Sequence, residues 1–347
     1  MKIETEKQKW TPMISIVIAA YNEEKRLDKC IHSVLQQTYQ DFEIVIINDG
    51  STDGTAEIIN KYIDEYKEKV VSINKKNGGQ ASARNCGIDI SRGKYITFLD
   101  ADDYIDRNYL LTLVSVAEKH RCNMVCSGQY KVKEDGEIID SILYKSHGGQ
   151  CLTRRLNISG KLYLTSYIKE NHIIFPEGKT YEDNSFNLQM FFLTNKIYFL
   201  DYAGYLQVVH EGSTTSKIIR IDNLPLTEWN ACIEKILSQS ETGVDIKLFE
   251  FTVLSLFAYL LLIRIRKREY LNNADRKSNV KNAVIIARDF QKITNTYFPY
   301  AKRNKYSKLF RYNELPLLQK LGVRVFSIMC YWGRLEGFTR VFYKLAK

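Results

Sequence analysis

ISIVIAAYNEEKRLDKCIHSVLQQTYQDFEIVII, residues 14–47, is the stretch that decides the fold of this chain. Its first part, Ile14–Ala19, is uncharged and rich in β-branched residues, which is typical of a strand buried on both faces of a parallel sheet. A second apolar run follows at Phe42–Ile47. Between them, Glu23–Gln37 carries apolar residues at steps of three and four, the spacing of one helical face. The stretch therefore predicts a strand, a helix and a second strand.

The same alternation continues outward from this unit. The next predicted elements are a helix at Thr55–Tyr66, a strand at Val70–Ile73, a helix at Ala81–Ile90 and a strand at Tyr95–Leu99. Alternation of this kind predicts a doubly wound α/β sheet, in which ligands lie beyond the carboxyl ends of the strands. From Met124 to Tyr144 the alternation weakens into short strands and turns, which predicts a mixed edge to the sheet.

The second part of the chain is predicted to be mainly helical. A helix after Asn184 and a strand at Ile197–Leu200 close the first domain, and apolar helix faces follow in Leu248–Ile265 and Val280–Ile293. We therefore expect an N-terminal extension (1–12), a catalytic domain (13–216) and a basic helical region (217–347). The longest uncharged apolar run, Phe251–Ile263, has 13 residues, whereas a membrane-spanning helix needs roughly 20, so no span is predicted.

Composition places the chain among globular proteins, with 45% hydrophobic and 26% charged residues. The net charge is +10, and the excess of basic residues lies in residues 217–347, which hold 24 Lys and Arg against 11 Asp and Glu (+13), whereas residues 1–216 hold 26 against 29 (−3). Such a field attracts nucleic acid, an anionic membrane surface or a phosphorylated substrate. The seven cysteines form no CxxC, and the first residues lack an apolar leader, so a reduced, cytoplasmic compartment is expected.

An aromatic residue and a carboxylate follow the first two predicted strands. Tyr21 comes after the first strand and Asp49 after the second. Together they can hold a planar heterocycle, because the ring stacks and the carboxylate accepts from a ring N–H. This predicts a nucleotide-base pocket. Asp49 and Asp53 are also good turn and helix-cap residues, and for Asp53 we prefer that interpretation.

Two glycines, Gly78 and Gly79, come directly before the predicted helix at Ala81–Ile90, and Arg84 lies one turn into it. Glycines there let the backbone approach a phosphate at the positive end of the helix. The signal is weak on its own. The chain holds no GxGxxG and no GxxxxGKS, so dinucleotide-binding and P-loop interpretations lose their main support.

Three carboxylates, Asp100, Asp102 and Asp103, lie at the exit of the predicted strand Tyr95–Leu99. Like charges gathered beside a buried strand are costly unless a cation neutralises them. Asp100 and Asp102 could each offer an oxygen to one divalent ion, Mg²⁺ or Mn²⁺, that also grips a diphosphate. The alternative is a solvated acidic turn in which Asp103 caps a helix.

Four segments in succession resemble the signatures of family 2 glycosyltransferases with the GT-A fold. They are ISIVIAAYNE (14–23), NDGSTD (48–53), NGGQASARN (77–85) and DADD (100–103). The resemblance covers about residues 13–216 and implies a Rossmann-like GT-A domain, as in capsule, exopolysaccharide and lipopolysaccharide enzymes. It implies an inverting hexosyl-type transferase (EC 2.4) that moves a sugar from a nucleotide diphosphate, usually UDP, to an acceptor hydroxyl.

The resemblance also implies residue roles. Tyr21 and Asp49 would contact the base, Arg84 the nucleotide and Asp102 the Mn²⁺ or Mg²⁺ ion, with Asp100 on the ribose or sugar side. The full nucleotide-binding set is Ala19, Tyr21, Glu23, Asp49, Gly79, Arg84, Asp100 and Ala101.

Two later segments carry further roles by resemblance. Residues 181–184, YEDN, are similar to a motif whose Asp is the catalytic base, here Asp183. Glu182 and Asp183 would also suit the start of a helix, where acids complement the dipole, and both roles can hold at once. Residues 210–215, HEGSTT, are similar to a stretch whose His can face the diphosphate or the metal. A lone His is often a structural hydrogen-bonding residue, so both interpretations of His210 stay open.

The C-terminal residues form a basic amphipathic pattern, with apolar residues at helical spacing and basic residues between them. The apolar set is Leu321, Val325, Ile328, Met329, Trp332, Leu335, Phe338, Phe342 and Leu345. Such a stripe can lie on an anionic membrane or pack on the catalytic domain. With the resemblance, it predicts an enzyme on the cytoplasmic face of the membrane that extends a lipid-linked glycan.

Two alternatives to this function stay open. One is a polyprenyl-phosphate sugar transferase, and the other is a non-catalytic protein that binds membrane or nucleic acid through its basic tail. The chain lacks a recognised nucleic-acid fold, so nucleic acid is not the expected partner. No coiled-coil pattern indicates an oligomeric state.

Overall fold

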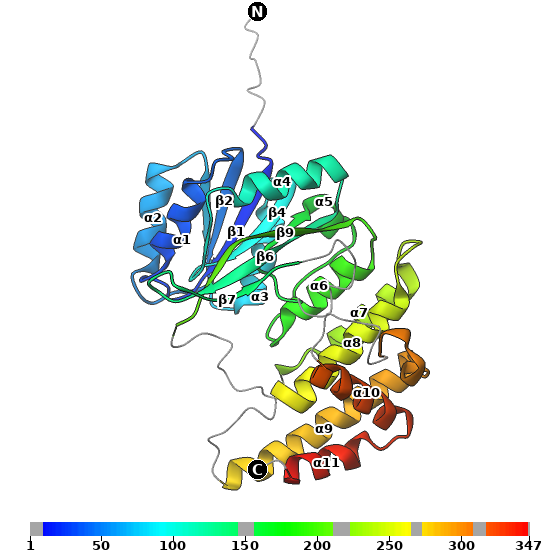
Figure 1. The fold of residues 1–347 in the computed structure, drawn as a ribbon. Helices are drawn as coiled ribbons and strands as arrows, with labels where there is room; N and C mark the ends of the chain where they lie inside the picture. Colours follow the sequence, from blue (N-terminus) through cyan, green and yellow to red (C-terminus); the bar gives the residue numbers. More distant parts are fainter. Residues whose placement is uncertain (1–9, 145–155, 211–222, 265–272, 308–316, 346–347) are drawn as a thin grey trace, which may run out of the picture. The chain divides into compact units, whose positions relative to one another are not determined.

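The computed structural model describes residues 10–144, 156–210, 223–264, 273–307 and 317–345 (Figure 1). The chain divides into two compact units. The sheet unit comprises residues 1–147, 158–178 and 196–215, and the helical unit comprises residues 148–157, 179–195 and 216–347. Residues 179–195, expected within the catalytic domain 13–216, thus group with the helical unit. The expected boundary after residue 216 lies outside the described residues, and the extension 1–12 is described only from Trp10.

One mixed sheet forms the centre of the sheet unit. Its described strands are β1 (Ile14–Ala20), β2 (Phe42–Asn48), β3 (Val70–Asn74), β4 (Tyr95–Asp100), β5 (Tyr104–Ile105), β6 (Met124–Val132), β7 (Ile138–Ile142), β8 (Lys161–Leu164) and β9 (Ile197–Val208). The strand order is β3-β2-β1-β4-β8-β6-β9-β5, with β7 beside β6. β1 pairs in parallel with β2 and β4, whereas β8 runs antiparallel to β4 and β6. The predicted α/β class and mixed sheet are confirmed.

β1 and β2 are buried along almost their whole length, as the apolar runs predicted. The one charged residue in them, Glu43, is fully buried. Its carboxylate accepts hydrogen bonds from the Ser15 hydroxyl at 2.6 Å and from the backbone N–H and Nε of Arg92 at 2.8 and 2.7 Å. A buried carboxylate is tolerated when it is paired in this way, so Glu43 does not interrupt the strand.

The helices of the sheet unit cover the sheet (Figure 1). They are α1 (Leu27–Leu35), α2 (Thr55–Glu65), α3 (Gln80–Ile90), α4 (Tyr109–His120) and α5 (Thr165–Glu170). α1 buries Leu27, Cys30, Ile31 and Val34, close to the face that its spacing predicted. These residues join a core with Ile16 and its neighbours in the sheet.

The helical unit confirms the mainly helical C-terminal region. Its described elements are α6 (Glu182–Phe192), α7 (Leu226–Gln239), α8 (Ile246–Tyr259), a π-helical turn (Leu260–Arg264), α9 (Asn273–Tyr297), two 3₁₀ turns (Ala301–Arg303, Lys305–Ser307), α10 (Leu317–Tyr331) and α11 (Leu335–Leu345). Phe257 of α8 stacks on Phe290 of α9 with ring centroids 4.1 Å apart, and Trp229 of α7 packs against both rings. This aromatic cluster anchors the three helices to one another.

One run in the described residues, Ile246–Ile263, is long and apolar enough to cross a membrane by length and composition alone. A search for uncharged runs misses it, because Lys247 and Glu250 shorten its uncharged part. Within the helical unit 67% of the run is buried. A buried core helix passes the same test, so the run is weak support for a span.

α3 approaches the sheet closely at Gly87. A β-carbon there would lie 2.3 Å from Cγ1 of Val17 in β1. We expect Gly87→Ala to lower the free energy of unfolding by about 1–3 kcal/mol, because a packed core resists extra volume. Gly337→Ala in α11 is the control, since its β-carbon would meet nothing within 4 Å, and it should be neutral or stabilising by up to about 1 kcal/mol. Urea unfolding measures both, and a fully stable Gly87→Ala protein would contradict this packing.

Candidate active site

The carboxyl ends of β1, β2 and β4 meet at one edge of the sheet. Ala20 of β1 pairs with Asn48 of β2, and Ala19 pairs with Asp100 of β4. The residues that follow these strands are therefore neighbours, as parallel strands require. Tyr21, directly after β1, has half of its surface exposed (49%).

Asp49 is buried and fixes the loop before α3. Its carboxylate accepts from Lys75 Nζ at 2.7 Å and from the backbone N–H groups of Gly78 and Gly79 at 3.0 and 2.7 Å. Gly79 has φ of 85°, a left-handed conformation that glycine adopts readily. The predicted base-pocket residue and the predicted phosphate loop are thus in direct contact. Asp53 has the predicted turn role, because its carboxylate accepts from the backbone N–H of Thr55 at 3.1 Å. The N-cap of α2 is Gly54, so the helix-cap part of that interpretation is wrong.

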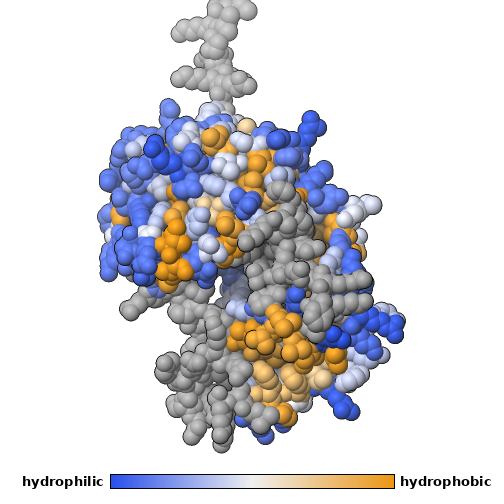
Figure 2. Space-filling model, viewed as in Figure 1, coloured by the Kyte–Doolittle hydropathy of each residue, from blue (hydrophilic) through white to orange (hydrophobic). Residues whose placement is uncertain are grey.

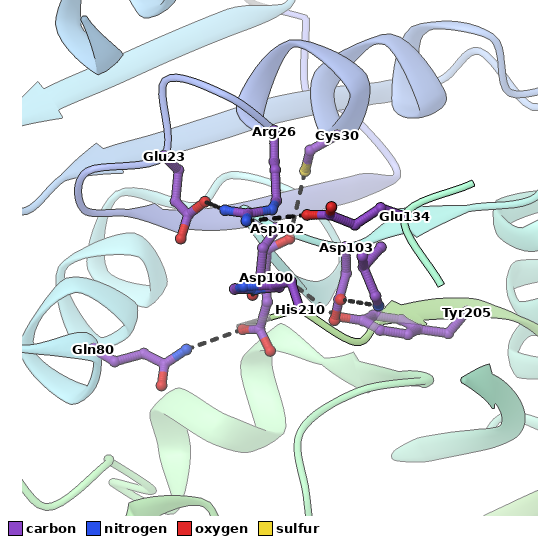
Figure 3. Close-up of polar contacts among 11 residues, drawn as sticks. Glu23, Arg26, Cys30, Gln80, Asp100, Asp102, Asp103, Glu134, Tyr205 and His210 are labelled. Carbon is purple, nitrogen blue, oxygen red and sulfur yellow. Dashed lines mark hydrogen bonds and ion pairs between the residues drawn. The ribbon is translucent and has the colours of Figure 1, made fainter. Parts of the chain in front are cut away.

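Asp100, at the end of β4, is held by two side chains from α3. Arg84 Nη2 donates to its carboxylate at 2.8 Å. Gln80 Nε2 donates to the same carboxylate at 3.1 Å (Figure 3). The Arg84 side chain is 3% exposed, and its guanidinium lies over the Phe175 ring. The predicted nucleotide residues Arg84 and Asp100 therefore meet. The contribution of Gln80 was not predicted from the sequence, although it lies one turn before Arg84.

Asp102 and His210 come together from distant parts of the chain. His210 Nε2 lies 2.8 Å from Asp102 Oδ2 (Figure 3). The His210 side chain is largely buried and the Asp102 side chain is partly buried. This brings together the two predicted metal-binding residues. The rest of the resembling segment, residues 211–215, lies outside the described residues. Among the residues that the structure describes, no group of three or more His, Cys, Asp or Glu side chains is arranged to hold a metal ion.

Asp103 is buried, so the alternative of a solvated acidic turn with Asp103 as a helix cap is wrong. Its carboxylate accepts from Tyr205 Oη at 2.8 Å and from the backbone N–H of Val208 at 2.7 Å, which ties the end of β4 to β9 (Figure 3). Burial, followed by the charges of Asp100 and Asp102, holds the pKa of Asp103 well above its usual range. The site therefore concentrates negative charge around a buried acid.

A chain of ion pairs borders the acidic cluster. Arg26 donates to Glu23 and to Glu134 at 3.2 Å each (Figure 3). Burial raises the pKa of the Glu23 carboxyl, and the charge of Asp102 raises it further, while Arg26 opposes both. The predicted residue Glu23 thus feels the charge of Asp102. Arg26 and Glu134 were missed, because nothing in the sequence pairs residues 108 positions apart.

The remaining predicted residues have simpler surroundings. Ala101 is 4% exposed and its side chain belongs to the core, so only its backbone can face a ligand. Asp183 and Glu182 lie in the first turn of α6, which confirms that they begin a helix. α6 belongs to the helical unit and is described with it. Cys122 and Cys126 are buried free thiols, as expected of small buried hydrophobic residues.

The family model "Glycosyl transferase family 2" matches residues 15–173. The chain is 30% identical over 217 residues to "Glycosyltransferase GlyA" of Streptococcus pneumoniae serotype 4, a match that covers 58% of this chain and 31% of GlyA. It is 31% identical over 218 residues to "Uncharacterized glycosyltransferase EpsJ" of Bacillus subtilis, a match that covers 59% of this chain and 63% of EpsJ. The matched region thus spans under two thirds of either relative.

Among solved structures, the fold resembles that of S. aureus TarS 1-349 in complex with UDP-GlcNAc. The TM-score is 0.71 at 21% sequence identity, and the likeness covers 94% of this chain and 91% of that one. This likeness shows the fold, which has a mixed sheet and a helical C-terminal region. Residues 15–173 therefore match the family 2 glycosyltransferase model, and the fold is the GT-A type that the four sequence segments predicted.

Proposed function

We propose that this chain transfers a sugar from a UDP-sugar donor to a hydroxyl of a cell-surface glycan, with inversion at the anomeric carbon. The single observation that carries the proposal is the meeting of Arg84, Asp100, Asp102 and His210 at the carboxyl edge of the sheet. The structural neighbour TarS is described in complex with UDP-GlcNAc, which supports UDP. Two relatives are named for transfer of a sugar to poly(ribitol-phosphate), which supports an acceptor hydroxyl on a polymer.

The nucleotide would lie along the strand ends. Tyr21 is exposed enough to stack on a base, and Asp49 stands on the neighbouring strand end to accept from a ring N–H. In the structure the Asp49 carboxylate accepts from Lys75 and the glycine loop. A ring N–H of the base would therefore compete with these donors for the oxygens of the Asp49 carboxylate. Arg84 supplies a guanidinium suited to a phosphate or a ribose contact.

The residues present fit a divalent cation, Mn²⁺ or Mg²⁺. Asp102 offers a carboxylate oxygen, a donor that suits Mn²⁺ or Mg²⁺, and the His210 ring nitrogen beside it would add a second donor. Burial and the charges of Asp100 and Asp102 raise the pKa of Asp103, and a cation bound beside these carboxylates would offset that charge. A bound cation would supply charge neutralisation at the diphosphate leaving group. Asp102 and His210 would hold it, and donor phosphate and water oxygens would complete the ligand set.

Inversion requires a base that takes the proton of the acceptor hydroxyl during displacement. We assign this role to Asp183 in the first turn of α6. The assignment rests on the similarity of residues 181–184 to the family motif. The acceptor is proposed to be a lipid-linked surface glycan.

A screen of nucleotide sugars tests the proposed function and identifies the donor. With Mn²⁺ present, we expect one UDP-sugar to raise the thermal midpoint and to be hydrolysed slowly to UDP. A donor at about 100 times its Kd stabilises the folded state by about 2.7 kcal/mol. GDP- and ADP-sugars at the same concentrations are the controls. If no nucleotide sugar stabilises the protein or is turned over, the proposed sugar transfer is wrong. The alternative of a non-catalytic protein that binds through its basic region is then favoured.

A further inference from the structure

An exposed apolar stripe runs along one side of α10 and continues into the residue directly after it. We define the α10 stripe as Leu318, Leu321, Val325, Ile328 and Trp332, which follow one another at steps of three and four and so share a helix face. Leu318 is 82% exposed, Leu321 47% and Trp332 60%, whereas Val325 and Ile328 between them are half-buried. The stripe is about 21 Å long at the rise of an α-helix. Single exposed apolar residues are ordinary, but a row of them on one face marks an interaction surface.

The opposite face of α10 is buried, which shows that the helix is fixed in place. Val323, Phe326 and Cys330 are each at most 2% exposed. The sequence predicted an amphipathic pattern over residues 321–345 that Gly322, Gly333 and Gly337 interrupt. The structure ends the helix at Tyr331 and starts α11 at Leu335, and Gly333 between them has φ of 65°. The α10 stripe is therefore a separate surface and not one half of a long helix.

The surroundings of the α10 stripe are basic. Arg324 and Arg334 are exposed beside it, and Lys302 Nζ lies over the Tyr331 ring, 3.1 Å from its centroid. Within residues 317–345 Glu336 is the one acidic residue in the sequence. Its carboxylate is already bound by Arg288 and Arg340. The surface thus combines exposed leucine and tryptophan side chains with Arg324 and Arg334, which form no ion pair with any residue that the structure describes.

We propose that the α10 stripe docks in the interfacial region of an anionic lipid bilayer. Leu318, Leu321 and Trp332 would enter the headgroup boundary, and Arg324 and Arg334 would contact lipid phosphates. Charge decides between this occupant and a second copy of the chain, because a symmetric dimer through the stripe would bring the same arginines together. Figure 2 shows hydrophobic residues gathered on the visible face of the helical unit. The proposal does not depend on the proposed sugar transfer.

Vesicle flotation of the full chain tests the proposal. We expect binding to vesicles that contain phosphatidylglycerol, weaker binding in high salt, and little binding to phosphatidylcholine alone. The triple variant Leu318→Ser/Leu321→Ser/Trp332→Ser should bind more than about tenfold more weakly. Arg324→Gln and Arg334→Gln should each weaken binding about fivefold. Leu111→Ser is the matched control, because Leu111 is 41% exposed on α4 of the sheet unit, and it should bind like the wild type.

Further measurements separate a docking defect from misfolding or a failed activity. In a Trp10→Phe background, brominated lipid should quench Trp332, whereas Trp229, which is 1% exposed, should stay unquenched in a folded protein. Hydrolysis of a soluble donor should be equal in the triple variant and the wild type. Undiminished vesicle binding by the triple variant, or equal binding to neutral and anionic vesicles, would overturn the proposal. A dimer seen by light scattering and lost in the triple variant would also overturn it.

Discussion

Asp183→Asn is expected to lower turnover by about 100- to 10,000-fold while leaving UDP binding unchanged. The loss follows from removing the group proposed to take the acceptor proton, since a positioned base contributes rate enhancement of this size. Asparagine keeps the shape of the side chain and its place in the first turn of α6. The proposed nucleotide residues all lie in the sheet unit, so nucleotide affinity should not follow the loss of rate. Release of UDP in the presence of acceptor measures turnover, and calorimetry measures UDP binding.

Glu182→Gln is the control for this substitution. Glu182 precedes Asp183 in the same helical turn and carries the same charge, so an effect on the helix dipole alone would appear equally in both variants. We expect the rate of Glu182→Gln to exceed that of Asp183→Asn by at least about tenfold. If Asp183→Asn retains full turnover, Asp183 is not the base. If both variants lose activity equally, the acids act on α6 and not on the acceptor.

Asp102→Asn is expected to abolish the stimulation of turnover by Mn²⁺ and to weaken UDP binding in Mn²⁺ by about tenfold or more. Both effects are expected because the substitution removes a charged ligand of the proposed cation. Asp102 Oδ2 lies 2.8 Å from His210 Nε2, so the substitution removes the carboxylate member of the pair. His210→Ala should raise the Mn²⁺ concentration that gives the half-maximal rate. Initial rates over a Mn²⁺ titration measure both effects.

Asp53→Asn is the control for Asp102→Asn. It also removes one negative charge near the carboxyl end of a strand, and its carboxylate serves the first turn of α2, a role that asparagine can take over. We expect its Mn²⁺ dependence to match the wild type. If Asp102→Asn keeps a normal Mn²⁺ response, Asp102 and His210 form a structural hydrogen bond and hold no metal.

The strands and the positions of the site residues could be predicted because both depend on local pattern. β1 and β2 are apolar runs that only a buried sheet accommodates. Parallel strands bring their carboxyl ends together, so the order of strands and acids along the chain is enough to place Asp49 and Asp100 at one edge of the sheet. The strands and the residues at their ends could therefore be predicted from the sequence.

Contacts between residues that are far apart in the sequence could not be predicted in this way. The burial of Asp103 depends on Tyr205 and Val208, more than 100 residues later, so the sequence also allowed a solvated turn. The pairing of Arg26 with Glu134 depends on how β6 and β7 return towards α1. Their turn chemistry alone predicts only a loop.

The C-terminal region shows the same limit. Helical spacing continues through residues 321–345, and the break between α10 and α11 depends on the left-handed backbone of Gly333. Glycine is a weak helix former, but periodicity cannot show which of the three glycines in this segment ends the helix. Exposure of the α10 stripe likewise depends on which face of the helix packs inside the helical unit.

Calorimetric titration of UDP into the wild-type chain, with Mn²⁺ and then with EDTA, tests most directly whether the strand-end acids hold a cation against a diphosphate. We predict saturable binding in Mn²⁺ and affinity at least about tenfold weaker in EDTA. Equal affinity in the two conditions would show that the strand-end acids hold no cation against the diphosphate.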